Sequence, residues 1–125
     1  MWGLEPPNAN PWAPLLTGSV DQRIHADGME RWFAVLRRRG PEWDHATPLR
    51  QQRLWDEHAT FTDGLEAAGL IRLAGPLDGS DEVLLICRGE SAEAVEARLA
   101  DDPWTPDLLR TVWIRQWNKL VGSLD

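Results

Sequence analysis

Two short apolar runs constrain the fold of this chain most strongly, one over residues 32–36 and the other over residues 83–87. Each run ends at polar or turn-forming residues and is too short for an ordinary helix, so both are predicted to be strands. Neither run alternates between apolar and polar residues. Both faces of the predicted sheet must therefore be covered.

An apolar stripe with helical spacing lies between these runs, and its members recur at intervals of four and three: Leu54, His58, Phe61, Leu65 and Ala68. Pro48 suits a first helical turn, and Gly69 suits the position after a last one. A second helix is predicted over residues 91–100, because Ser91 can cap it, and Pro103 must follow its end. Further strands are predicted over residues 70–74 and 111–117.

The order strand, helix, strand, strand, helix, strand predicts a ferredoxin-like α+β fold, with an antiparallel sheet and both helices on one face. A chain of 125 residues suits one domain. The domain is placed at residues 29–122, after a proline-rich N-terminal arm over residues 1–28. Two helices cover only one face of a sheet, so the other apolar face is expected to pack against a second copy in a homodimer.

Composition excludes several classes of function. The net charge of −7 disfavours nucleic acid and anionic membrane surfaces as partners. The basic run 37–39 is interpreted as a solvated strand end. The single cysteine, Cys87, lies inside an apolar run, so neither a disulfide nor a thiolate metal centre is expected. No phosphate-binding loop, dinucleotide motif or metal-binding histidine pair occurs, so no cofactor or metal is expected, and the lack of a targeting segment predicts a cytoplasmic protein.

His58 and Asp102 are the candidates for acid/base chemistry. Of the three histidines, only His58 lies on a predicted helix. It would act as a general base or acid, and Asp102 would fix its tautomer and support its charged form. An alternative remains open at this point: His58 bonded to a backbone carbonyl at the core margin, with Asp102 as an ordinary turn residue.

The chain has eight tryptophans and no tyrosine. Indole rings suit flat aromatic or polyketide-like substrates, so several tryptophans are predicted to wall a substrate cavity: Trp55, Trp104, Trp113 and Trp117. Core packing and dimer contacts are the alternative. Gly75 and Pro76 either approach a ligand closely or form a plain hairpin turn.

Taken together, a set of segments resembles the YCII-related (YciI-like) domain family over roughly residues 30–122. The segments are Trp55-Asp56-Glu57-His58 with Phe61, Gly69, Gly75-Pro76, Asp78-Gly79, the helix 91–100, Asp102-Pro103-Trp104 and residues 114–117. The resemblance implies a dimeric α+β barrel whose active-site histidine and aspartate fall on His58 and Asp102. Substrate contacts are expected from Trp55, Phe61, Gly75, Pro76, Trp104 and Trp113. The chain departs from the family at Gln116, where proline is common, and in the arm.

Two functions are weighed on this basis. In the first, the protein is a cofactor-independent enzyme in which His58 and Asp102 catalyse elimination or isomerisation of a small cyclic or aromatic, polyketide-like substrate, as some members of the resembled family do. In the second, it is a non-catalytic dimer that binds a small molecule. A cofactorless oxygenase is a further alternative, suggested by related barrels.

Overall fold

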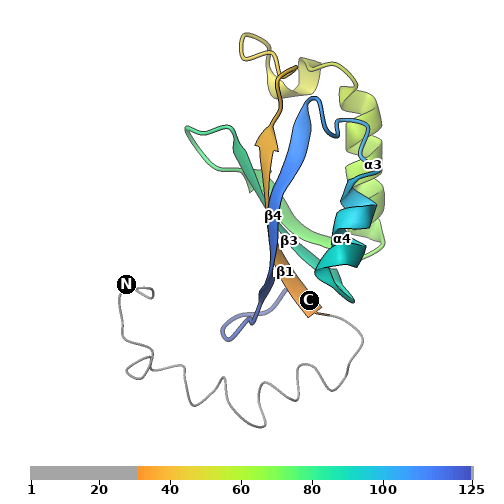
Figure 1. Ribbon diagram of the computed structural model, residues 1–125, viewed down its shortest axis with the longest axis vertical. Helices are drawn as coiled ribbons and strands as arrows, with labels where there is room; N and C mark the ends of the chain where they lie inside the picture. The colour runs from red at the N-terminus through yellow and green to blue at the C-terminus, as the bar shows by residue number, and fades with distance from the viewer. Residues whose placement is uncertain (1–30, 125) are drawn as a thin grey trace.

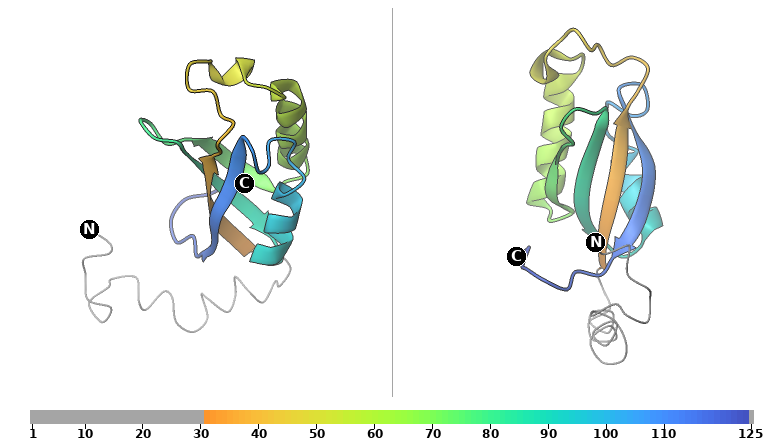
Figure 2. Two further views of the ribbon diagram at one scale, coloured as in Figure 1. Left: turned by 45° about the horizontal axis from the view of Figure 1, so that its top comes forward. Right: turned by 90° about the vertical axis from the view of Figure 1, so that its left-hand side faces the viewer.

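The computed structural model describes residues 31–124, which form a four-stranded antiparallel sheet with two α-helices on one face (Figures 1 and 2). The strand order is β2-β3-β1-β4. The elements are β1 (Arg31–Arg39), the short 3-10 helix η3 (Leu49–Gln51), α3 (Trp55–Ala67), β2 (Ile71–Pro76), β3 (Glu82–Gly89), α4 (Ala92–Leu99) and β4 (Leu109–Trp117). This confirms the predicted ferredoxin-like α+β fold. The proposed arm, residues 1–28, lies outside the described residues.

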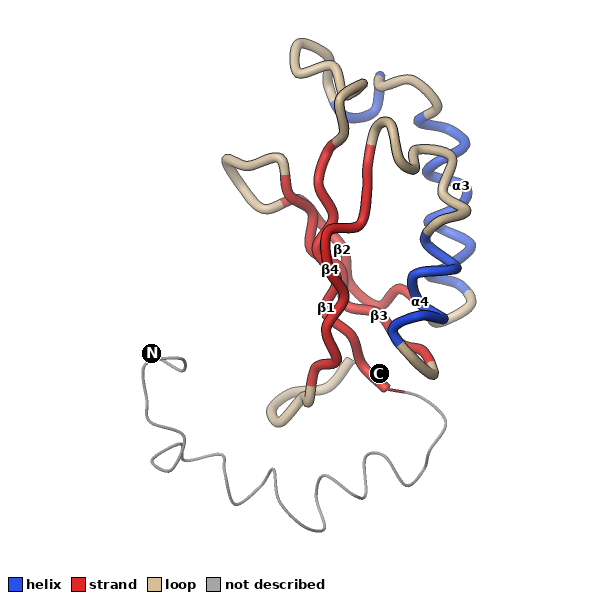
Figure 3. Tube along the Cα trace, in the orientation of Figure 1, coloured by secondary structure: helices blue, strands red, loops and turns tan. Residues whose placement is uncertain are grey.

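The main core lies between the helices and the two central strands, β1 and β3 (Figure 3). Alternate residues of each strand point toward the helices, where they meet the apolar side of α3 and α4. The buried members of this core are Phe33, Val35, Leu65, Ile71, Leu85, Cys87, Val95 and Leu99. Cys87 is therefore a buried core residue, as its sequence context predicted.

The opposite face of the sheet is also largely apolar, and no helix within residues 31–124 covers it (Figure 2). Its side chains are identified by the strand register, because cross-strand partners share a face and neighbours along a strand alternate. They include Trp32, Leu36, Leu84, Ile86, Trp113 and Trp117. We refer to this set as the open face.

Two predicted boundaries are wrong. β1 continues to Arg39 rather than ending before Arg37, and Arg37 is only 2% exposed, so the solvated strand end is not observed. The first helix begins at Trp55, well after Pro48, because the 3-10 helix and the left-handed Leu54 (φ 62°) intervene. At the other helix the prediction is confirmed, since the hydroxyl of Ser91 accepts from the amide of Ala94 at 3.0 Å.

The end of β1 packs directly on the loop that follows α4. The amide of Gly40 donates to the carbonyl of Leu108 at 2.9 Å. A Cβ atom at residue 40 would lie 2.3 Å from the carbonyl oxygen of Asp107, so only glycine permits this approach. The contact holds the 102–108 loop against the strand that carries Arg37.

Candidate functional site

The site is built around the carboxylate of Asp102, in the loop that connects α4 to β4. This residue is 3% exposed and still has three partners. Its Oδ2 accepts from Arg37 Nη1 on β1 at 2.9 Å, and its Oδ1 accepts from the backbone amide of Trp104 at 3.0 Å. The third partner is His58 on α3. Residues far apart in the sequence are thus joined by one buried carboxylate.

His58 binds Asp102 through one ring nitrogen. Its Nδ1 lies 2.9 Å from both carboxylate oxygens. An ionised carboxylate only accepts, so Nδ1 carries the proton and Nε2 has the free lone pair when the ring is neutral. Within residues 31–124, Nε2 has no hydrogen-bond partner. The contact with Asp102 replaces the alternative in which His58 is satisfied by a backbone carbonyl.

The surroundings of Asp102 keep it ionised. Burial by itself would raise the pKa of this carboxyl group. The hydrogen bonds from His58 and from the Trp104 amide, together with the charges of His58 and Arg37, outweigh burial and hold the pKa below its ordinary value. Asp102 is therefore a carboxylate at neutral pH, as a group that orients an imidazole must be.

Arg37 is the site residue that sequence reasoning missed. Besides Asp102, its guanidinium donates to Thr105 Oγ1 at 2.6 Å, and burial lowers its pKa against the opposing effect of Asp102. The signal was present in the strand period: Phe33, Val35 and Arg37 occupy alternate positions and so share the helix-facing side. The prediction that residues 37–39 form one solvated run overlooked this alternation, and so the burial of Arg37 was not predicted.

Trp104 fixes the plane of the imidazole. The two rings are stacked, with centroids 3.8 Å apart and planes 7° apart. Trp104 is itself 2% exposed, and its indole Nε1 donates to the carbonyl of Arg53 at 2.6 Å. Trp55 and Trp43 pack around it, with ring centroids 5.8 Å and 5.3 Å from that of Trp104. His58 is thus restrained both at Nδ1 and across its face.

A cavity of about 200 Å³ opens beside the imidazole. Four of the residues predicted to contact substrate line it together with His58: Trp55, Gly75, Pro76 and Trp104. Phe61 borders a smaller adjoining space of about 60 Å³, together with His58 and Asp102. Gly75 and Pro76 belong to the end of β2 rather than to the hairpin turn. The structure thus brings together most of the predicted site.

Trp113 is the exception among the predicted contacts. It is paired with Leu36, whereas its neighbour Ile114 packs on the core. Because successive side chains of a strand point to opposite faces, Trp113 lies on the open face, away from His58. The prediction that Trp113 lines this cavity is wrong for a single chain. Trp117, paired with Trp32, lies on the same open face.

Other chemical arrangements are limited in the described part of the chain. No three side chains of His, Cys, Asp or Glu come together there as metal ligands would. The nearest analogue of the site is an exposed pair, His45 and Asp81, whose Nε2 and Oδ1 are 3.0 Å apart. Of the helices in residues 31–124, none combines the length and apolar character required to cross a bilayer.

Comparison with known proteins adds little to this geometry. No family model and no curated protein matches the chain, so the YciI-like resemblance is not confirmed. A structural-genomics structure of protein YJCS is similar, with a TM-score of 0.46 and 14% sequence identity. The similarity covers 73% of this chain and 99% of that one.

Proposed function

We propose that the protein is a cofactor-independent acid/base enzyme in which His58 moves a proton on a small cyclic substrate. One observation carries the proposal. His58 is held at Nδ1 by a buried carboxylate, which leaves Nε2 as the basic atom of a ring that lines a cavity. A general base needs this orientation, because its second ring nitrogen must keep a lone pair for the substrate. The YciI-like resemblance, which implies an active site at the same two residues, supports the assignment.

The reaction requires no other group. Nε2 of His58 takes a proton from a carbon atom of the substrate, and the C–H electron pair stays on that carbon. In an elimination this pair forms a double bond as the neighbouring group leaves; in an isomerisation the proton returns to another carbon. Asp102 stabilises the imidazolium that forms in either case, and it stays ionised while doing so.

The cavity suits a small, flat molecule. Its volume of about 200 Å³ is below the range of roughly 300–1,000 Å³ that accommodates drug-sized ligands. Tryptophan rings line it at Trp43, Trp55 and Trp104. Their faces favour planar ring systems, which also delocalise the electron pair left by proton removal.

Replacing the base tests the proposal. Nitrobenzisoxazole is a flat, neutral carbon acid whose ring opens when a base removes its C–H proton, with cleavage of the N–O bond to a coloured cyanonitrophenolate. Because a positioned general base contributes about 10²–10⁴ in rate, His58→Ala should lower kcat/KM for this probe by at least about 100-fold. The matched control is His45→Ala, which removes an exposed histidine outside the cavity.

Two results would contradict the proposal. One is a folded His58→Ala protein with an unchanged melting temperature and unchanged probe turnover. The other is an equal loss of turnover in both histidine variants. Either would favour the alternative of a non-catalytic binding protein.

We also propose that the active form is a homodimer in which two open faces pack together. Apolar side chains dominate this face, and monomers seldom leave an apolar patch of more than a few hundred Å² uncovered.

Sedimentation at micromolar concentration should show a dimer. Ile86→Lys, at the centre of the face, should give a folded monomer, whereas Val121→Lys, at a site 70% exposed and outside the face, should not. A wild-type monomer would contradict the proposal.

A further inference from the structure

The described side chains that line the cavity beside His58 include cationic groups but no carboxylate. Among the described residues that line it, only Arg39 and His58 have side chains that can carry a charge, and both are cationic when protonated. No described aspartate or glutamate borders it. Asp102 contacts Nδ1 of His58 and borders the smaller space of about 60 Å³, not this cavity. A ligand in the larger cavity therefore meets the cation of Arg39 without a facing carboxylate.

The guanidinium of Arg39 has unused hydrogen-bond donors. Its Nε is buried and has no acceptor among residues 31–124. Its nearest charged partner is Asp81, but Nη1 and Oδ1 are 3.8 Å apart, which is too long for a hydrogen bond. The guanidinium carbon lies 4.4 Å from the centroid of the Trp43 ring, which holds its plane in place. The guanidinium of Arg39 is thus held in place by Trp43, while part of its hydrogen-bonding capacity is unused.

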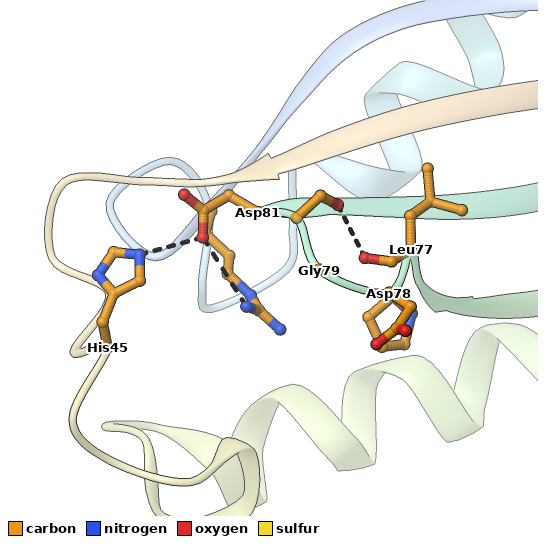
Figure 4. A pocket seen from close by; sticks show the side chains of 8 residues that line it. His45, Leu77, Asp78, Gly79 and Asp81 are labelled. Atoms are coloured by element: carbon orange, nitrogen blue, oxygen red, sulfur yellow. Dashed lines mark hydrogen bonds and ion pairs between the residues drawn. The ribbon is translucent and has the colours of Figure 1, made fainter.

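Arg39 also borders a second, more open hollow. This hollow has a volume of about 560 Å³ and lies under the hairpin between β2 and β3 (Figure 4). His45 and Asp81 also line this hollow and are paired with each other, as a dashed line in Figure 4 shows. Since Arg39 and Pro76 line both spaces, Arg39 marks the boundary between the solvent-facing hollow and the cavity of His58.

We propose that Arg39 binds a carboxylate on the substrate, so that the substrate class is a small planar ring acid. A carboxylate matches the planar, forked donors of a guanidinium, which can bind both of its oxygens. The ring would then extend between the tryptophans toward Nε2 of His58. This inference rests on the proposed function, because it assigns the ligand of the same cavity.

Asp81 is the described group that competes for Arg39. Its side chain is 49% exposed and already accepts from Nε2 of His45. Exposed ion pairs of this kind contribute only about 0–1 kcal/mol, so an incoming carboxylate can displace it. Asp81→Asn should accordingly tighten carboxylate binding by up to about fivefold.

Benzoate and benzamide test the proposal, because they have nearly the same shape and differ in charge. Binding to the full chain is followed by the indole N–H signals in NMR titrations. Benzoate should bind more tightly than benzamide. Arg39→Gln should weaken benzoate binding by about 10-fold or more, the effect of losing a charge-assisted hydrogen bond, and should leave benzamide binding unchanged. The control is Arg38→Gln, since Arg38 pairs with Glu82 outside the cavity.

The inference is overturned if benzoate shows no saturable binding, if benzamide binds as tightly, or if Arg39→Gln binds benzoate like the wild type. These outcomes are distinct from a failure of the proposed function. The nitrobenzisoxazole assay uses a neutral probe and depends on His58, whereas benzoate binding depends on Arg39 and involves no turnover. His58→Ala should still prefer benzoate to benzamide.

Discussion

Asp102→Asn is expected to lower turnover of nitrobenzisoxazole by about 10²–10⁴, although the substitution changes only one non-hydrogen atom of the side chain. In the wild type, Asp102 accepts from Nδ1 of His58 and so leaves the lone pair on Nε2. An asparagine that turns its carbonyl oxygen toward Arg37 presents its NH₂ group to His58. The imidazole must then accept at Nδ1 and protonate at Nε2, which removes the base.

The measurement is kcat/KM across pH, with Asp101→Asn as the control. Asp101 is adjacent but exposed, and within residues 31–124 its side chain makes no hydrogen bond or ion pair with His58. Benzoate binding should survive in both variants, which would show that the cavity is intact. Comparable turnover in Asp102→Asn and Asp101→Asn would show that Asp102 does not orient the base.

Asp102→Leu is expected to destabilise the fold by about 3–5 kcal/mol, because it leaves the buried Arg37 cation without a counter-charge. Arg37→Met should destabilise it less. In that variant Asp102 keeps the hydrogen bonds from His58 and from the Trp104 amide, whereas Arg37 has no second anionic partner among the described residues. Loss of Asp102 should therefore lower the free energy of unfolding more than loss of Arg37 does.

Urea denaturation of both single variants and of the double variant measures this asymmetry. The double variant should recover most of the loss, since replacing a buried ion pair by apolar residues is often neutral. Arg38→Met with Glu82→Leu is the control for a partly exposed pair, and its effect should be small. Additive losses in the double variant would contradict the expectation.

The parts of the fold that sequence predicted are those set by local chemistry. The apolar runs located β1 and β3, Ser91 and Pro103 bounded the second helix, and the helical spacing of His58 placed it toward the sheet. The pairing of His58 with Asp102 was also predicted, because the first helix and the loop after the second meet at one end of such a sheet.

The errors concern residues whose environment depends on distant segments. Arg37 was assigned to solvent because its neighbours are also arginines, yet the partner that allows its burial lies 65 residues away. Trp113 was assigned to the cavity by residue type alone. Its face is set by a register shift between β1 and β4 at Leu36 and Arg37, and nothing local in the sequence encodes that shift.

The ion pair of Arg37 and Asp102 also has a consequence for the order in which the chain folds. During synthesis, Arg37 is made 65 residues before its counter-charge, an interval of roughly 3 to 13 s at ordinary translation rates. Until Asp102 arrives, burying β1 would also bury an unpaired cation. The sheet and the site should therefore close in the same late step, and ribosome-bound chains that stop short of residue 102 should lack both.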